Sequence, residues 1–148
     1  MKFIASDCRK IERIQERALR AVYKTKGETY ETLLNWSGLP TLLNRRLQDI
    51  AIYMYKVKHD LAPSIISELF TAKHKQHLLR NADFNIPRYD TLKYGKHTLR
   101  YLGPVLWSKL NRDIKSKTTL KSFKKCIRKI DIANILDNNV NCCELCTM

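Results

Sequence analysis

The chain has 148 residues, enough for one domain with its own core, and its 28 lysines and arginines against 14 acidic residues give a net charge of +14. Small domains usually carry a net charge of about 2 to 8 in magnitude, so this excess indicates a polyanionic partner, most often nucleic acid and less often an anionic membrane surface. No apolar run approaches the roughly 18 residues that cross a bilayer, which excludes a membrane-spanning helix. The first ten residues also lack the apolar stretch of about 7 to 15 residues found in secretory signals, so we expect an intracellular protein, in the nucleus, the cytoplasm or both.

The first predicted helix covers residues 7–24, because apolar residues recur there at spacings of three and four. These apolar residues are Ile11, Ile14, Ala18 and Val22. At about 100° per residue, a basic stripe falls roughly opposite the apolar stripe, which predicts a helix with one apolar and one basic face. The basic stripe consists of Arg9, Arg13, Arg17, Arg20 and Lys24.

Two further helices are predicted in the next part of the chain. A short one covers residues 29–36 and is closed by Gly38 and Pro40. Thr41 then begins a longer helix with Arg45 and Arg46 in its first turns. Its apolar residues alternate spacings of four and three, which predicts a core-facing seam. The seam consists of Leu43, Leu47, Ile50, Met54 and Val57.

Regular pattern is weaker in the middle of the chain. Pro63 suits the first position of a short helix, and residues 71–97 are polar and basic without a helical seam, which predicts a long irregular segment. Gly103 and Pro104 suit the N-cap and first residue of the next helix.

The last predicted helix covers residues 119–130. Its seam consists of Leu120, Phe123, Ile127 and Ile130, and its opposite face carries Lys121, Lys125, Arg128 and Lys129. We therefore predict a mainly α fold of five to six helices in a basic module of residues 1–131. Residues 132–148 are predicted to form a flexible tail that contains cysteines.

The sequence argues against an enzyme. Polymerases hold two divalent cations with clustered carboxylates, and no two of the 14 acidic residues are adjacent. The four glycines are isolated, so no phosphate-cradling loop is present, and no Gly-X-Ser-X-Gly motif appears.

Two groups of residues have the spacing of metal ligands. His74 and His77 lie three residues apart, but their basic surroundings favour solvated side chains over a metal site. At the C-terminus, Cys142, Cys143 and Cys146 offer half of a zinc site at most, and a tail with free thiols is the simpler interpretation. We expect no cofactor, with zinc at these cysteines as the alternative.

Aromatic residues alternate with basic ones between residues 88 and 107, a composition that suits stacking on unpaired bases. The aromatic residues are Tyr89, Tyr94, Tyr101 and Trp107, and the basic ones are Arg88, Lys93, Lys96 and Arg100. Trp107 lies within an apolar helix pattern, which favours a core position for it. Tyr89 and Tyr94 fit stacking and packing about equally well.

Several blocks of the sequence, in order, resemble the region that follows the polymerase domain in non-LTR (LINE-type, jockey-like) retrotransposon reverse transcriptases. The blocks read KIERIQERALRAVY, ETYETLLNWSGLPTLLNRRL, MYKVKHDLAPSIISELF, LLRN and YGKHTLRYLGPVLWSKLNRDIKSKTTLKSFKK, and they span roughly residues 10–129. The resemblance implies a truncated C-terminal module without the catalytic Tyr-X-Asp-Asp motif or the endonuclease. Many such elements end in a Cys-X-Cys-X-X-Cys tail, from which the cysteines here depart by one residue.

Charge and resemblance together predict a non-catalytic module that binds element RNA or target DNA. The phosphate contacts are assigned to Arg9, Arg13, Arg17, Arg20, Lys24, Arg45, Arg46, Lys121, Lys125, Arg128 and Lys129. One alternative is a helical platform that packs on the thumb of an upstream reverse transcriptase domain. Another is a relic without a present function.

Overall fold

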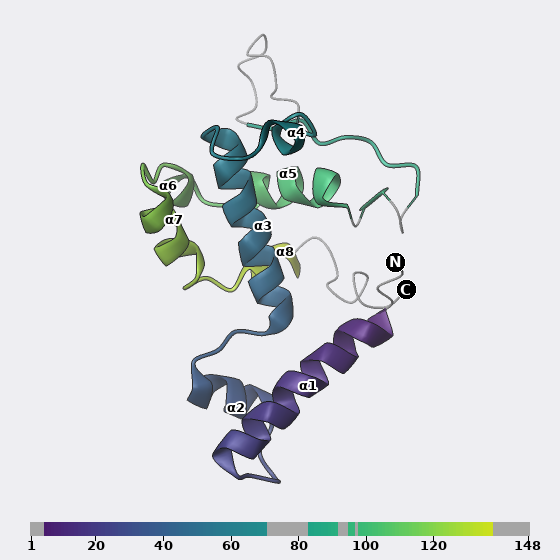
Figure 1. Ribbon diagram of the computed structural model, residues 1–148, viewed down its shortest axis with the longest axis vertical. Coiled ribbons are helices and arrows are strands. Elements are labelled where there is room, and N and C mark those ends of the chain that lie inside the picture. The colour runs from purple at the N-terminus through teal and green to yellow at the C-terminus, as the bar shows by residue number, and fades with distance from the viewer. Residues whose placement is uncertain (1–4, 71–82, 92–94, 97, 138–148) are drawn as a thin grey trace.

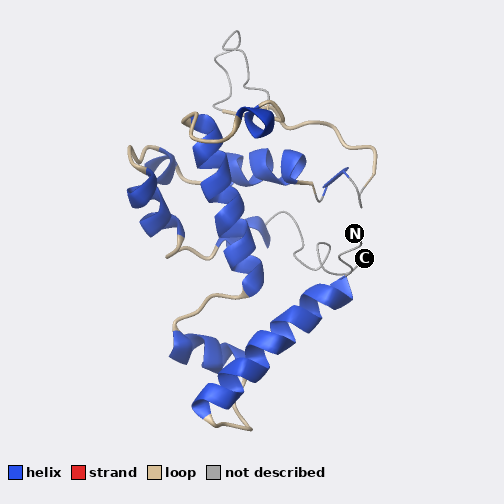
Figure 2. Ribbon diagram, viewed as in Figure 1, coloured by secondary structure: helices blue, strands red, loops and turns tan. Residues whose placement is uncertain are grey.

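The computed structural model describes residues 5–70, 83–91, 95–96 and 98–137, with the side chains of residues 9–136 within these ranges. Within these residues the chain is mainly helical, as predicted (Figure 2). The helices are α1 (Ala5–Tyr23), α2 (Tyr30–Ser37), α3 (Leu42–Lys58), α4 (Ser64–Ser67), α5 (Leu99–Lys109), α6 (Arg112–Lys115), α7 (Leu120–Ile127) and α8 (Ile132–Asp137). The described residues thus hold eight helices, more than the five to six expected, because α6 and α8 are too short to show a period.

Threonine side chains cap the N-termini of three helices, α2, α3 and α7. The hydroxyls of Thr29, Thr41 and Thr119 each accept a hydrogen bond from the backbone N–H three residues later. Such a bond satisfies one of the N–H groups that the first turn of a helix leaves without a partner. At the end of α2, Gly38 adopts a left-handed conformation with φ of 64°, which glycine reaches without strain.

Helix α3 is the centre of the larger part of the molecule, and α5, α7 and α8 pack around it (Figure 1). Leu47, Met54 and Val57 of the predicted seam are buried, while Leu43 and Ile50 are half-buried. The helix also buries residues outside the seam, namely Asn44, Gln48, Ala51, Ile52 and Tyr55. A single apolar stripe therefore understates how much of α3 is covered, because neighbours lie on several of its sides.

Aromatic rings connect α3 to α5 and α7. Tyr55 stacks on Phe123 with ring centroids 4.4 Å apart, and Trp107 lies 6.0 Å from Phe123. The Tyr55 hydroxyl donates a hydrogen bond to the Lys117 carbonyl at 2.8 Å, so its polar end is satisfied inside the core. Trp107 is 1% exposed, which agrees with the predicted core position.

The start of α5 differs from the prediction. The helix begins at Leu99 after Thr98, so Gly103 and Pro104 lie inside it. A Cβ atom on Gly103 would approach the Met54 sulfur to 2.6 Å, so this glycine allows α5 to lie close to α3. The glycine and proline were assigned to a helix start from local rules, whereas helix packing determines their place here.

The predicted tail also differs, because residues 132–137 form α8. Ile132 is fully buried and Leu136 is 3% exposed, both within the main core. Asn44 of α3 accepts a hydrogen bond from the Ile132 N–H at 2.9 Å, and Gln48 donates one to the Ile130 carbonyl at 3.0 Å. These amides connect α3 to the segment before α8, so the core extends past residue 131.

We expect Asn44→Ala to lower the free energy of unfolding by about 1–3 kcal/mol, because the buried Ile132 N–H would lose its acceptor. Denaturant unfolding followed by circular dichroism measures the change. Asn35→Ala is the matched control, since Asn35 is exposed on α2 and should change stability by less than about 0.5 kcal/mol. Equal effects of the two substitutions would contradict this role of Asn44.

Helices α1 and α2 form a smaller lobe with its own apolar cluster. Leu19, Leu33 and Leu34 are its buried residues, and Tyr23 and Tyr30 pack against them. The apolar stripe predicted for α1 is largely not its buried face, because Ile14 is 63% and Val22 is 71% exposed. Leu19 is the buried position, so α1 turns a different side toward α2 than its apolar stripe suggested.

Candidate nucleic-acid interface

The orientation of α1 depends on contacts made by polar side chains. Glu12 accepts one hydrogen bond from the Tyr30 hydroxyl at 2.7 Å and another from the Leu43 N–H at 3.2 Å. Gln15 adds a weaker hydrogen bond to the Pro40 carbonyl. The carboxylate of Glu12 thus accepts a hydrogen bond from an N–H that has no partner within the first turn of α3, where negative charge is favoured. Burial, reinforced by this carboxylate, raises the pKa of the Tyr30 phenol, so the donor stays protonated.

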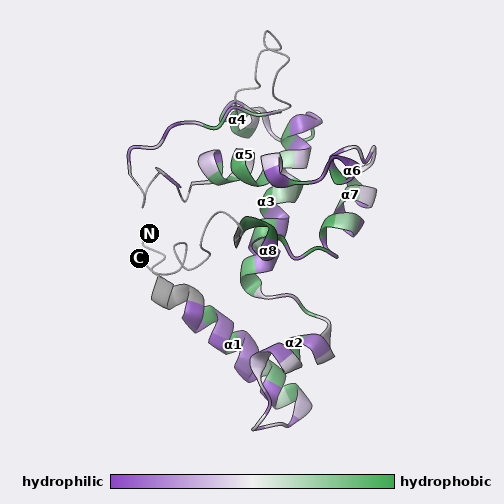
Figure 3. Ribbon diagram, turned by 180° about the vertical axis from the view of Figure 1, so that it is seen from behind, coloured by the Kyte–Doolittle hydropathy of each residue, from purple (hydrophilic) through white to green (hydrophobic). Residues whose placement is uncertain are grey.

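With α1 held in this way, most of its predicted basic stripe faces solvent. Arg9, Arg13, Arg17 and Lys24 are exposed. Arg20 is the exception, because its guanidinium pairs with Glu16 at 2.8 Å and donates to the Lys26 carbonyl. In Figure 3 most of α1 is coloured hydrophilic, with hydrophobic positions interspersed. The exposed surface of α1 is therefore mixed, since Ile14 and Val22 of the predicted apolar stripe face solvent as the cations do.

Helix α7 separates its two faces cleanly. Phe123 and Ile127 are fully buried, while Leu120 and Ile130 at the ends of the predicted seam are half-buried. The predicted basic residues Lys121, Lys125, Arg128 and Lys129 are all exposed. Lys121 and Lys125 lie on α7, Arg128 is its C-cap and Lys129 follows, so these four cations form a basic surface on and just after a helix that is held by its buried side.

The predicted phosphate-binding residues do not form one continuous surface. Figure 1 shows α1 in the smaller lobe and α7 on the far side of α3 in the larger one. Arg46, near the start of α3, is exposed, and Arg45 is half-buried. The structure thus presents two separate basic surfaces, one on α1 and one at α7.

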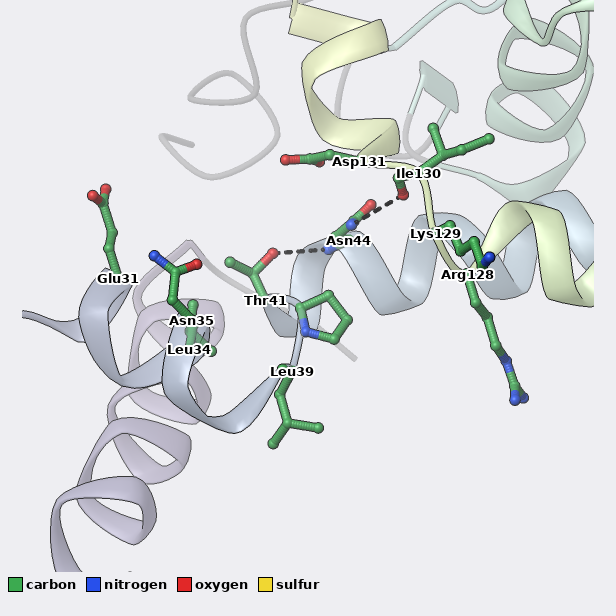
Figure 4. A pocket seen from close by; sticks show the side chains of 12 residues that line it. Glu31, Leu34, Asn35, Leu39, Thr41, Asn44, Arg128, Lys129, Ile130 and Asp131 are labelled. Carbon is green, nitrogen blue, oxygen red and sulfur yellow. Dashed lines mark hydrogen bonds between the residues drawn. The ribbon is translucent and has the colours of Figure 1, made fainter. Parts of the chain in front are cut away.

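A cleft of about 520 Å³ lies between the lobes, where α2, the start of α3 and the segment before α8 meet. Figure 4 shows Arg128 and Lys129 on one side of it and Glu31 and Asn35 on the other. Asn44 lies between the two sides, and its amide is already bonded to the backbone on either side of Asp131. The cleft therefore carries mixed charge, and the basic surface of α7 reaches its edge.

The aromatic residues separate into different roles. Tyr89 is 39% exposed and meets Tyr101 edge to face, with ring centroids 4.8 Å apart. The two tyrosines line a pocket together with Arg88 and Arg100. Tyr94 and Lys93 lie outside the described residues. The sequence pattern did not reveal a third basic group, Lys58, Arg112 and Lys115, which lines one cavity, and two of its members, Lys58 and Lys115, lie over the Trp107 ring.

The candidate metal ligands lie outside the part of the chain that the structure describes, namely His74, His77, Cys142, Cys143 and Cys146. Within the described residues, no group of three or more His, Cys, Asp and Glu side chains is arranged to hold a metal ion. The zinc alternative at the terminal cysteines thus stays a prediction.

No family model, curated protein or solved structure matches this chain. Among the described residues, none of the helices combines the length and the apolar character that crossing a bilayer requires.

Proposed function

We propose that the chain is a non-catalytic module that binds the phosphate backbone of RNA or DNA. The observation that carries the proposal is the arrangement at α7, where Lys121, Lys125 and the C-cap residue Arg128 are exposed while Phe123 and Ile127 are fully buried. Cations of one sign on a surface of fixed orientation attract a polyanion, and each phosphate contact releases a condensed counterion. The exposed cations of α1 form a second surface for the same ligand.

Such contacts go to phosphate oxygens, which carry little sequence information. Trp107 is buried and so offers no base-stacking surface, while Tyr89 is the exposed aromatic side chain beside Arg88. We therefore infer weak sequence preference for this module. We further propose that it derives from the C-terminal region of a non-LTR retrotransposon reverse transcriptase, on the strength of the ordered sequence blocks. An in-frame Tyr-X-Asp-Asp motif encoded upstream of Met1 would support that origin.

Binding of the full chain to single-stranded RNA and duplex DNA, measured by fluorescence anisotropy at several salt concentrations, tests the proposed function. If about six phosphates are neutralised, log K against log salt should fall with a slope of roughly −4 to −5. Oligonucleotides of scrambled sequence and equal length serve as the control and should bind with similar affinity. Binding that does not respond to salt, or no binding at all, would contradict the proposal.

A second candidate function is a helical platform that packs on a neighbouring protein domain, such as an upstream reverse transcriptase. The observation that favours it is the exposed apolar side of α1, where Ile14, Ala18 and Val22 face solvent. Contiguous exposed apolar surface commonly marks a protein interaction site. A chain that self-associates in analytical ultracentrifugation and binds no nucleic acid would favour this candidate over the first.

A further inference from the structure

Three cations and one carboxylate line a cavity of about 670 Å³ beside Trp107. Lys58 ends α3, Arg112 and Lys115 lie at the two ends of α6, and Asp83 precedes the extended segment of residues 84–91. None of these residues belongs to the surfaces of α1 and α7. The cavity is therefore a separate feature that three distant parts of the chain build together.

Asp83 organises this cavity. One of its oxygens, Oδ2, accepts a hydrogen bond from the Trp107 indole N–H at 2.7 Å and lies 2.9 Å from the Lys58 ammonium. Burial alone would raise the pKa of Asp83, but the hydrogen bonds from Trp107 and Lys58 outweigh it, and the pKa lies below its usual value. Asp83 is thus a carboxylate at neutral pH, and the three cations leave a local excess of two positive charges.

Lys115 is held beside other cations in a half-buried position that disfavours its charge. Burial lowers the pKa of Lys115, with further lowering by Lys58 and Arg112, while Asp83 opposes the shift only in part. The Lys115 and Lys58 ammonium groups both lie over the Trp107 ring, at 5.8 and 5.6 Å from its centroid, which offers each a weak cation–π attraction. Lys115 also donates a long hydrogen bond of 3.4 Å to the Ser108 carbonyl. An anion in the cavity would relieve the repulsion between these cations.

We propose that this cavity binds a phosphate group. An arginine fork and two lysines approaching from separate segments suit a tetrahedral oxyanion, and the Asn111 side chain at the cavity wall offers further N–H donors. The excess of two positive charges matches the dianion of a terminal or free phosphate, whereas an internal phosphodiester carries a single negative charge. The phosphate can come from the end of a nucleic-acid strand, from an internal phosphodiester or from a small phosphorylated solute. The first two sources rest on the proposed nucleic-acid function, whereas the third does not.

Trp107 provides a direct reporter of the cavity, because the chain has only two tryptophans and Trp36 lies in the other lobe. In a Trp36→Phe background, all indole fluorescence comes from Trp107. Titration with inorganic phosphate at constant ionic strength, balanced with chloride, should give a saturable change as the cations over the ring are engaged. No saturable change would overturn the proposal.

Charge-removing variants test which residues bind the anion. Lys115→Met keeps the apolar stem, and Arg112→Gln keeps hydrogen-bonding capacity, so both should stay folded by circular dichroism. Each should weaken phosphate binding by about tenfold or more, as expected for one charge-assisted contact. Lys117→Gln is the matched control, because Lys117 is two residues from Lys115 and does not line the cavity. Unchanged affinity in both cavity variants, or equal weakening in the control, would overturn the assignment.

Two short RNAs of one sequence, one with a 5′-phosphate and one with a 5′-hydroxyl, distinguish the sources. Tighter binding of the phosphorylated RNA that is lost in Lys115→Met identifies a terminal phosphate. Equal binding of both with a Trp107 response identifies an internal phosphodiester, and a response to inorganic phosphate alone identifies a small solute. RNA binding by anisotropy without any Trp107 response to RNA or phosphate would overturn the cavity proposal and leave the proposed function standing. A Trp107 response to phosphate without RNA binding would contradict the proposed function and leave the cavity proposal standing.

Discussion

Phe123→Ala is expected to lower the free energy of unfolding by about 3–5 kcal/mol. Phe123 is fully buried, stacks on Tyr55 and lies 6.0 Å, between ring centroids, from Trp107. Removing the ring loses its transfer free energy and leaves a cavity that these large rings cannot readily fill. Because domains of this size are stable by only about 5–15 kcal/mol, the loss is a large share of the total.

Denaturant unfolding of the full chain measures this effect, and Phe123→Leu keeps it measurable if the alanine variant does not fold. The leucine variant retains most of the volume and should lose less than about 1.5 kcal/mol. Trp36→Ala is the control for removal of an aromatic ring, because Trp36 is 51% exposed in the smaller lobe and should cost far less. A Phe123→Ala variant as stable as the parent would show that the core is not organised around this ring.

Removing the cations of one basic surface is expected to have the largest effect on nucleic-acid binding. Changing Lys121, Lys125, Arg128 and Lys129 to glutamine should flatten the slope of log K against log salt by about 3, because four phosphate contacts are lost at 0.7 to 0.9 each. At roughly 0.1 M salt the same loss corresponds to about a thousandfold weaker binding. Glutamine is a good helix former and the buried face of α7 is untouched, so the fold should persist.

The same change on α1 replaces Arg9, Arg13, Arg17 and Lys24, and leaves Arg20 in place because it pairs with Glu16. A control variant of equal net charge carries glutamine at Lys26, Lys56, Lys73 and Lys117, none of which is among the residues assigned to either surface. If binding depends only on total charge, the control will weaken it as much as the others, which would remove the assignment to α1 and α7. A folded α1 variant that binds as tightly as the parent would assign α1 to protein packing, the second candidate function.

Local rules predicted the starts of α2, α3 and α7 well, because the capping threonine hydroxyl accepts a hydrogen bond from an N–H only three residues away. The same locality explains the errors. Gly103 and Pro104 have the composition of a helix start, but the close approach of α5 to Met54 places them inside a helix. The period in α1 identified a helix but not its buried side, because the decisive contacts of Glu12 come from Tyr30 and from the backbone of α3.

The sequence by itself determined the mainly α fold, the apolar seam of α7 and the excess of positive charge, because composition and helical period are properties of neighbouring residues. It also placed the cations of that helix opposite its apolar seam, as the structure has them. Only the tertiary structure decided that Asn44 and Gln48 are buried, since their partners lie 80 or more residues later. The cavity beside Trp107 depends on tertiary structure in the same way, because Lys58, Asp83 and Lys115 meet only when three segments fold together. Periodicity carries no information about such contacts, which arise from how separate elements pack.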